Sequence, residues 1–422
     1  MSSGAMKLLA QASRQPWRRT IVLWLSFVGL VSALVFLRGG PQSLFSELDP
    51  TTATGVCFDG YEVRLPCDFV KVYYRQGVSL RERPEAVRGF YYSPFFAVGM
   101  RSLAHLPFAV ARAVWLSIVL LGVAALVCLP SLLAILTTSR ASLAYVFVLS
   151  TSLPLLHDLL YGQVSSILLA LVGLSYWAYQ RKRGALSAAL LGLATAIKFY
   201  PALFAIYYLL RRDVRATLQF SVTVLVCVVL IPWAVLGGQA YVAFVTSIAR
   251  NLSSLQLYLE TTAYSNAAVT VLPEAARVWF GFGAAARPAA VGLSVCVALV
   301  LLTLIARAAR RNDSRSALLL SLAALPFVVR SCWVHYFVFL PLLQASVLVA
   351  SSAKGASASL RWWGLFGSLI SAAVISYPYF ILVGDADSYY RAGFPFWATL
   401  VLLPALCLDQ LRLGGREAPD SG

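Results

Sequence analysis

Long apolar runs separated by short basic segments make up most of the chain. A run of about 20 apolar residues is long enough to cross a bilayer as an α-helix, and such runs recur from residue 20 to residue 411. With an even number of crossings between successive basic segments, the pattern predicts twelve membrane-spanning helices, at about 20–38, 112–135, 141–157, 163–180, 184–197, 199–210, 216–236, 288–306, 316–331, 334–351, 361–383 and 393–411. We therefore predict an all-α polytopic membrane protein, with residues 1–422 forming one integral membrane module.

Charge sets the predicted orientation of these helices. The chain carries 34 Lys and Arg against 17 Asp and Glu, a net charge of +17, while 60% of its residues are apolar and mean hydropathy is +0.77. The predicted cytoplasmic segments include both termini and hold 19 of the Lys and Arg but 5 of the Asp and Glu, as expected when basic residues stay inside. The basic excess thus indicates topology rather than a nucleic-acid partner, and the composition excludes a soluble enzyme fold.

Two longer segments fall outside the membrane on this map. They are a first outer loop at 39–107 and a second outer loop at 237–287. Within the first loop, residues 94–107 are apolar but too few to span, and they include Arg101 and His105, so we predict an interfacial helix there. The polar residues 414–422 predict a disordered tail.

One predicted helical hairpin is unusually short. The range 184–210 lies between two basic clusters and must therefore cross the membrane and return, with Lys198 at its apex. Each arm of such a hairpin reaches only about 20 Å at 1.5 Å per residue, so the apex should stay below the outer headgroups. A cation at that depth is costly and is a candidate functional group.

Two cysteines in the first outer loop are candidates for a disulfide. Cys57 and Cys67 lie ten residues apart, in a compartment that permits disulfide formation. A bond between them would fix the backbone immediately before Asp68. Two unpaired thiols are the other interpretation.

Metal-binding patterns are scarce. The three histidines are widely separated, and neither Cys-x-x-Cys nor His-Glu-x-x-His occurs, so no metal site is predicted. Asp385-Ala-Asp387 has the spacing that holds a divalent metal in some enzymes that use nucleotide sugars. Nucleotide sugars are cytoplasmic, however, and this pair falls on the predicted outer side, so we favour a solvated loop there.

The first outer loop carries the most concentrated polar chemistry. Asp68 begins a helix-like stretch rich in aromatic and basic residues, and an arginine group, Arg81, Arg83 and Arg88, precedes the predicted interfacial helix. One interpretation is a carboxylate base beside cations that hold a lipid phosphate. The other is an N-cap aspartate on an amphipathic helix whose arginines contact lipid headgroups.

An ordered set of short motifs resembles glycosyltransferase family 87, the polyprenol-phosphate-mannose-dependent α-mannosyltransferases of GT-C architecture. The set runs through nearly the whole chain: Asp68-Phe69 with Tyr73-Tyr74, then Tyr91-x-Ser93-Pro94-Phe95, Tyr161-Gly162-Gln163, Gly192-x5-Lys198-x2-Pro201, Trp233, Asn266 and Ser331-x3-His335.

This resemblance implies roles for individual residues. Asp68 is then the general base, with Asp59 as its local rival. The residues that would bind the donor phosphate or sugar are Lys198, Arg75, Arg88, Gln163 and His335, and Arg81 is a further candidate. The acceptor side would include Tyr73, Tyr92 and Asn266. His335 as a helix-end histidine and Gln163 as a helix cap are the structural alternatives. Because a lipid phosphate is already a good leaving group, no metal or other cofactor is expected.

The resemblance also implies a reaction and a location. We expect an inverting glycosyltransferase in the cytoplasmic membrane that moves a sugar, mannose by resemblance, from a polyprenyl-phosphate donor to a lipid or glycan acceptor on the outer face. A lipid-linked sugar flippase, or a periplasmic oligosaccharide polymerase or ligase, are the alternatives. The candidate residues cluster on one side, which favours a one-sided enzyme over a transporter.

Overall fold

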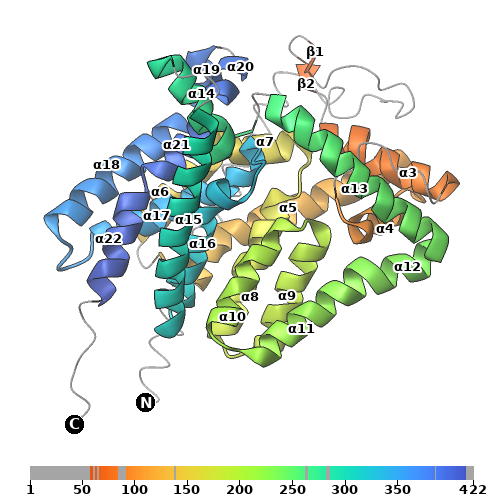
Figure 1. The fold of residues 1–422 in the computed structure, drawn as a ribbon, viewed down its shortest axis with the longest axis horizontal. Helices are drawn as coiled ribbons and strands as arrows, with labels where there is room; N and C mark the ends of the chain where they lie inside the picture. The colour runs from red at the N-terminus through yellow and green to blue at the C-terminus, as the bar shows by residue number, and fades with distance from the viewer. Residues whose placement is uncertain are drawn as a thin grey trace.

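The computed structural model describes residues 58–59, 62–63, 66–83, 92–136, 139–261, 265–281, 286–384 and 386–414. In this part of the chain nearly all residues are helical, which confirms the all-α architecture (Figure 1). The predicted span at 20–38 and the tail after Gly414 lie outside the described residues.

The first half of the described chain contains one small sheet and a series of helices. The sheet pairs β1 (Phe58–Asp59) antiparallel with β2 (Glu62–Val63). The helices are η1, a π-helix (Phe69–Tyr74), α3 (Arg75–Glu82), α4 (Pro94–Leu103), α5 (Phe108–Leu132), α6 (Ser139–Thr151), α7 (Leu153–Tyr161), α8 (Ser165–Gln180), α9 (Gly184–Ile197), η2, a 3₁₀ helix (Tyr200–Ala205), and α10 (Ile206–Leu210).

The second half is helical throughout its described residues. Its helices are α11 (Val214–Leu225), η3, a π-helix (Val226–Leu230), α12 (Ile231–Leu236), α13 (Gly238–Thr261), α14 (Ala268–Phe280), α15 (Ala286–Arg310), α16 (Ser314–Val328), η4, a 3₁₀ helix (Val334–Phe339), α17 (Leu340–Ser351), α18 (Ala358–Val374), α19 (Tyr377–Val383), α20 (Ala386–Ala392), α21 (Phe394–Leu400) and α22 (Leu403–Gly414). The range predicted as a second outer loop is thus mostly occupied by two helices, α13 and α14.

Several of these helices are long and apolar enough to cross a membrane. Within the described ranges, five qualify by length and composition, and a sixth if the bent pair α7–α8 is one span. The five are Phe108–Leu132, Val214–Leu236, Ala286–Arg310, Val334–Ser351 and Ser388–Arg412. The chain is therefore a multi-pass membrane protein, and the count of twelve spans stays a prediction.

Two predicted spans are each divided by a break, so they are not single straight helices. Residues 141–157 divide at Ser152, before α7, and residues 361–383 divide at Ile375 and Ser376, before α19. Each break has the sequence Ser-x-Pro, in which proline fits the first turn of the following helix but cannot continue the preceding one. The two breaks pair as an isolated antiparallel bridge between Ser152 and Ser376.

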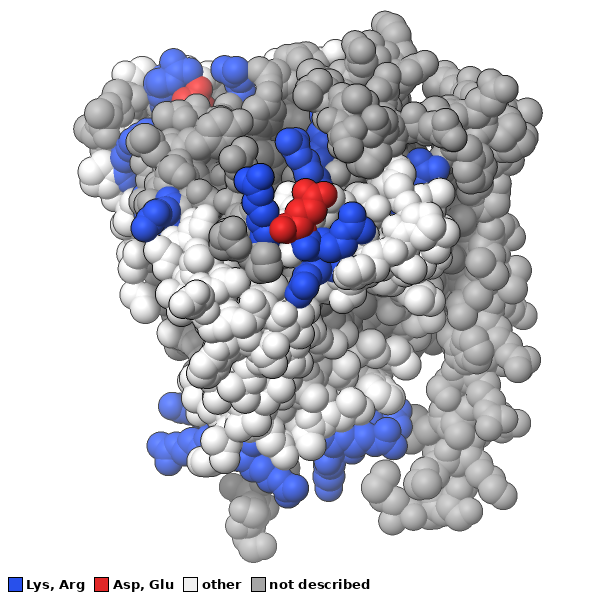
Figure 2. Space-filling view, turned by 90° about the vertical axis from the view of Figure 1, so that its right-hand side faces the viewer, with Lys and Arg blue, Asp and Glu red and all other residues white. Residues whose placement is uncertain are grey.

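The basic connections lie together at one end of the bundle. Arginine side chains donate hydrogen bonds to backbone carbonyls of neighbouring connections: Arg211 to Ala309 at 3.0 Å, Arg311 to Gln410 at 3.3 Å and Arg412 to Lys354 at 2.8 Å. In Figure 2 a band of Lys and Arg at the lower edge is separated by mostly uncharged surface from a second charged group. We call these connections, at 181–183, 211–212, 307–311 and 354, the basic end.

The described parts of the first outer loop lie at the other end. Figure 1 places the sheet, α3, α4 and α7 in the upper part of the molecule, whereas the α8–α9 and α10–α11 turns are at the bottom. We call this the Asp68 end. The predicted interfacial helix is α4, and Ser93 caps it by accepting a hydrogen bond from Phe96 N–H at 3.2 Å.

Cysteine labelling of intact cells tests which end faces outward. Arg75 and Arg183 are both exposed, at the Asp68 end and the basic end respectively. If the basic end is cytoplasmic, Arg75→Cys should react with an impermeant maleimide above the background of the unsubstituted chain. Arg183→Cys should react only after permeabilisation, and its labelling in intact cells would reverse the predicted topology.

Candidate active site at the Asp68 end

Asp68 lies at the start of the π-helix η1, where the first outer loop meets α7 and α8. Asp68 occupies the N-cap position of η1, but its backbone is helical and its side chain makes no capping hydrogen bond. Instead, its Oδ2 accepts a hydrogen bond from Gln163 Nε2. Oδ1 has no hydrogen-bond partner among the described residues, which leaves one carboxylate oxygen for another ligand.

Gln163 is the centre of a buried hydrogen-bond network. Its Oε1 accepts hydrogen bonds from Tyr73 at 2.8 Å and Tyr92 at 3.0 Å, and the two phenol oxygens are 2.5 Å apart. Because an ionised carboxylate can only accept, the amide nitrogen must face Asp68. Gln163 is therefore not a cap of α8, and the network fixes the orientation of Asp68.

The turn that carries Gln163 is held from two sides. Gly162 has φ +64, and a Cβ there would lie 2.5 Å from Pro66 Cβ, so only glycine lets the Asp68 segment approach this closely. Its carbonyl accepts a 2.8 Å hydrogen bond from Trp115 Nε1. On the other side Asp158, fully buried in α7, accepts hydrogen bonds from Ser165 N–H at 2.9 Å and Ser166 N–H at 3.1 Å.

Asp158 was not predicted from the sequence. It lies within an apolar run, seven residues before the start of α8, and the usual N-cap signal is a polar residue directly before the helix. In the fold it caps α8 across the bend between α7 and α8, which is 115°.

Burial tunes the acidity of Asp68. Loss of solvent raises the pKa of this carboxyl from 3.8 to about 6, against the opposing effects of Lys198, the Gln163 hydrogen bond and Lys71. Burial also raises the pKa of Tyr73 and of Tyr92 above the ordinary phenol value, so both stay protonated. Asp68 is then ionised at neutral pH yet basic enough to accept a proton.

Lys198 lies close to this network without a direct ion pair. It follows α9, and its Nζ is 4.8 Å from the ring centroid of Tyr92 and 4.1 Å from that of Tyr336. Contacts of a cation with ring faces offset part of its desolvation cost. No described carboxylate lies within 4.0 Å of its Nζ. The lysine is thus directed into the protein rather than extended to the surface.

Ser93 links Tyr92 to this lysine. While capping α4, its hydroxyl donates a hydrogen bond to the carbonyl of Ala196, near the end of α9. This contact explains why Ser93 and Lys198, about a hundred residues apart in the chain, lie at one place.

His335 joins the site from η4. It is 4% exposed, and its ring lies 5.0 Å from that of Tyr336, the ring that contacts Lys198. Asn266 is fully buried beside the same segment, and its backbone N–H donates a 2.6 Å hydrogen bond to the carbonyl of Cys332. The structure thus brings together Asp68, Gln163, Tyr73, Tyr92, Lys198 and His335, with Asn266 near the last of these.

Other predicted residues do not join this group. Arg75 is exposed at the start of α3, and its side chain makes no hydrogen bond or ion pair with the described residues. Arg81 donates a 3.0 Å hydrogen bond to the carbonyl of Ala104 and so fastens α3 to the end of α4. Asp59 lies in β1, with its side chain outside the described part. Arg88, Asp385 and the Asp387 side chain are also outside it.

Cys67 forms a disulfide bond, whereas Cys128, Cys227, Cys296, Cys332 and Cys407 are free. Cys57, its predicted partner, lies outside the described residues, so the pairing stays a prediction.

The described residues contain no group of three or more His, Cys, Asp or Glu placed to hold a metal ion.

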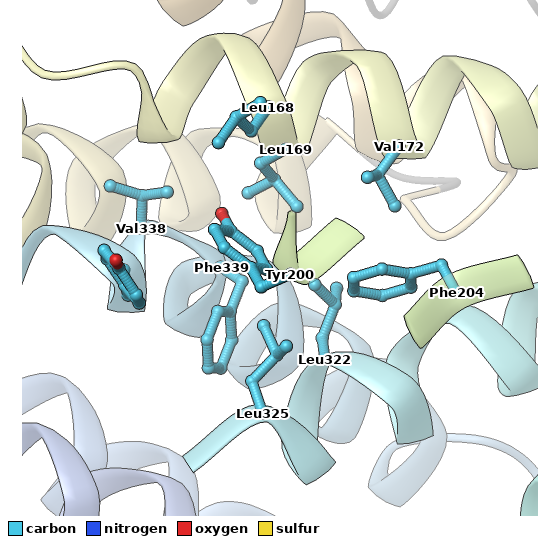
Figure 3. Close-up of a pocket in the computed structure, with 10 residues that line it drawn as sticks. Leu168, Leu169, Val172, Tyr200, Phe204, Leu322, Leu325, Val338 and Phe339 are labelled. Carbon is cyan, nitrogen blue, oxygen red and sulfur yellow. The ribbon is translucent and has the colours of Figure 1, made fainter. Parts of the chain in front are cut away.

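An apolar pocket adjoins the lysine. Figure 3 shows its side chains converging from four elements. They are Leu168, Leu169 and Val172 from α8, Tyr200 and Phe204 from η2, Leu322 and Leu325 from α16, and Tyr336, Val338 and Phe339 from η4. Tyr336 lines this pocket and also contacts Lys198, and it stacks on Tyr200 at 5.2 Å between ring centroids.

Comparison with known families supports the resemblance seen in the sequence. The model of glycosyltransferase family 87 matches residues 90–334, more than half of the chain. This range includes Tyr92, Gln163 and Lys198, and it stops just before His335. Comparisons with curated proteins and with solved structures gave no match.

Removal of the Asp158 carboxylate should destabilise the site. Asp158→Ala leaves two buried N–H groups at the start of α8 without partners, and we expect a loss of about 2 kcal/mol in unfolding free energy. Asp158→Asn keeps one acceptor oxygen and should lose less. Thermal unfolding of the purified protein measures both, with the exposed Ser117→Ala as the control. An unchanged melting temperature in Asp158→Ala would contradict the capping role.

Proposed function

We propose a function that starts from two facts: the chain belongs to glycosyltransferase family 87, and its buried site combines a carboxylate with a lysine. The protein is a membrane glycosyltransferase. In our proposal it moves a sugar, mannose by family resemblance, from a polyprenyl-phosphate donor to a lipid or glycan acceptor on the outer face of the cytoplasmic membrane.

One observation carries this proposal. Asp68 and Lys198 are close enough for each charge to influence the other, but they form no ion pair among the described residues. Partly buried opposite charges that do not meet are costly, unless a ligand completes their environment. A hydroxyl at Asp68 and a phosphate at Lys198 would do so.

The surroundings of Lys198 are apolar, which favours a lipid phosphate as the ligand. Tyr336 contacts Lys198 and also lines the apolar pocket, whose cavity of about 10 Å³ has room for about one water molecule. The hydrocarbon chain of a donor would therefore lie outside this pocket, and the choice of a polyprenyl-phosphate donor rests on the family resemblance.

The reaction is a single displacement. Asp68 takes the proton from an acceptor hydroxyl, whose oxygen forms a bond to the anomeric carbon of the donor sugar. The bond from that carbon to the phosphate oxygen breaks, and Lys198 stabilises the phosphate charge that develops. One displacement inverts the anomeric carbon, so a β-linked donor gives an α-linked product. Gln163 and the two tyrosines keep Asp68 in place while its charge changes.

The arrangement of charge supports the outer face. The site lies at the Asp68 end, and the basic end with its arginine-rich turns is at the opposite side of the bundle. Basic residues favour the cytoplasmic side. A flippase would need functional charges toward both faces, whereas these candidate groups gather at one.

Asp68→Asn should abolish transfer and leave donor binding nearly unchanged. Asparagine keeps the shape and one acceptor oxygen but cannot take a proton, so we expect kcat to fall by about 10² to 10⁴. The assay is mass analysis of a one-hexose gain with polyprenyl-phosphate-mannose and a membrane lipid extract. Asp59→Asn is the matched control. Equal losses in both variants would attribute the effect to the net charge of the loop.

Transfer should also depend on pH through Asp68. The active form of the carboxyl is ionised, and its pKa is raised to about 6, so activity should be full above pH 7 and fall as pH decreases through 6. Below that, the rate should fall about tenfold per pH unit. The residual activity of Asp68→Asn should lack this acidic limb. A wild-type limb near pH 4 would contradict the burial of the base.

Lys198→Met should impair donor use more than stability. Methionine has a similar length and no charge, and it removes a buried cation without a carboxylate partner, so the ligand-free protein should melt at the same temperature or higher. Affinity for the donor should fall at least tenfold, since a charged hydrogen bond to phosphate is lost. Lys182→Met, exposed at the basic end, is the control. Full activity in the Lys198 variant would exclude phosphate binding.

A further inference from the structure

Two buried imidazoles face each other beside the lysine. His157 of α7 and His335 of η4 have ring centroids 5.5 Å apart and planes inclined by 24°. His157 is 9% exposed and His335 is 4% exposed. Neither Nδ1 atom has a hydrogen-bond partner among the described residues. Buried polar atoms in folded proteins are nearly always paired, so two such atoms at one place indicate a partner outside the chain.

Aromatic rings surround this pair. Tyr161 stacks on His157 with ring centroids 4.1 Å apart and planes 6° from parallel, and Tyr390 approaches His157 edge-on at 6.2 Å. On the other side, His335 contacts Tyr336, whose ring holds Lys198. A row of rings thus leads from the lysine through Tyr336, His335 and His157 to Tyr161.

The chemistry of this row fits a sugar ring. A neutral imidazole offers one donor and one acceptor nitrogen, and sugar hydroxyls both donate and accept. Apolar and aromatic walls with a few placed polar atoms are typical of small-molecule sites. A phosphate accepts hydrogen bonds only, and in our proposal it is bound by Lys198. A hydrocarbon chain would leave both Nδ1 atoms without a hydrogen-bond partner.

We propose that His157 and His335 form a sugar-binding subsite, in which their unpaired ring nitrogens hydrogen-bond the hydroxyls of a hexose next to the phosphate at Lys198. His157 is then a further substrate-binding residue. This proposal rests on the proposed function, because that function supplies the polyprenyl phosphate to which the hexose is attached. The hexose belongs to the donor or to the acceptor, and the two cases are separable by experiment.

Binding of two lipids to the full-length protein tests the subsite. The probes are polyprenyl phosphate and polyprenyl-phosphate-mannose, titrated against the protein in nanodiscs. The wild type should bind the mannosylated lipid more tightly. His157→Phe keeps a ring that can stack between Tyr161 and His335 but has no nitrogen. In this variant the ratio of the affinities for the mannosylated lipid and for polyprenyl phosphate should fall about tenfold. The affinity for polyprenyl phosphate itself should stay unchanged.

Stability separates substrate binding from a structural role. Replacing an unpaired buried nitrogen by carbon is neutral or stabilising, so ligand-free His157→Phe should melt at or above the wild-type temperature. A clear decrease would mean that the imidazole is structural and would overturn the proposal. His157→Gln, which keeps a polar side chain, should recover part of the preference. His105→Phe, exposed in the turn after α4, is the control and should change nothing.

The remaining outcomes identify the sugar or reject the subsite. If His157→Phe keeps the preference for the mannosylated lipid but raises the KM for the acceptor about tenfold, the subsite binds the acceptor sugar. If neither quantity changes, the subsite is refuted while the transferase remains. A wild type that binds neither lipid would refute the polyprenyl-phosphate donor and the subsite together.

Discussion

The hydrogen bond from the Gln163 amide to Asp68 is the contact on which the rest of the site depends. It is the only side-chain hydrogen bond to that carboxylate within the described residues, and the same amide binds Tyr73 and Tyr92 through its other atom. An uncharged donor suits this position, because a cation there would lower the pKa of Asp68 and weaken it as a base. The positive charge is instead kept apart, at Lys198.

That separation explains why the helices around the site are broken. A straight helix through α9 would continue along the bundle, but α9 ends at Lys198, whose backbone is extended before η2 begins. The break lets the side chain turn between the rings of Tyr92 and Tyr336. A lysine at this depth costs least when it faces the protein interior and aromatic surfaces, and the ring contacts leave its N–H donors available for a phosphate.

Much of the site could be predicted from the sequence, but which side chains converge there could not. The chemistry of the first outer loop points to Asp68, the short hairpin points to Lys198, and the ordered family motifs add Gln163. Arg75 is a candidate of the same analysis but is exposed, because it lies two residues beyond the buried Tyr73 and on the opposite side of the helix. His157 was not named, since a histidine inside an apolar run gives no signal until His335 is found beside it.

The helical breaks also show that tertiary contacts cannot be predicted from the sequence alone. The Ser-x-Pro sequences at Ser152 and Ser376 are signals for the start of a helix. The prediction of membrane spans nevertheless ignores them, because it treats each apolar run as one straight helix. Their consequence depends on tertiary structure, because the two breaks pair with each other through the 2.7 Å hydrogen bond from Leu153 N–H to the Ile375 carbonyl. Ser152 has an extended backbone that separates α6 from α7, and α7 carries His157 and Asp158.

The π-helix η1 explains how Asp68 and Tyr73 contact the same glutamine. Asp68 and Tyr73 are five residues apart, and both contact Gln163. In an α-helix, side chains at that spacing point about 140° apart around the axis, so one glutamine could not reach both. The wider turn of a π-helix, with its i→i+5 hydrogen bonds, brings them toward one face. Tightening η1 into an α-helix would therefore separate the base from the network that orients it, which gives a physical reason for this rare geometry here.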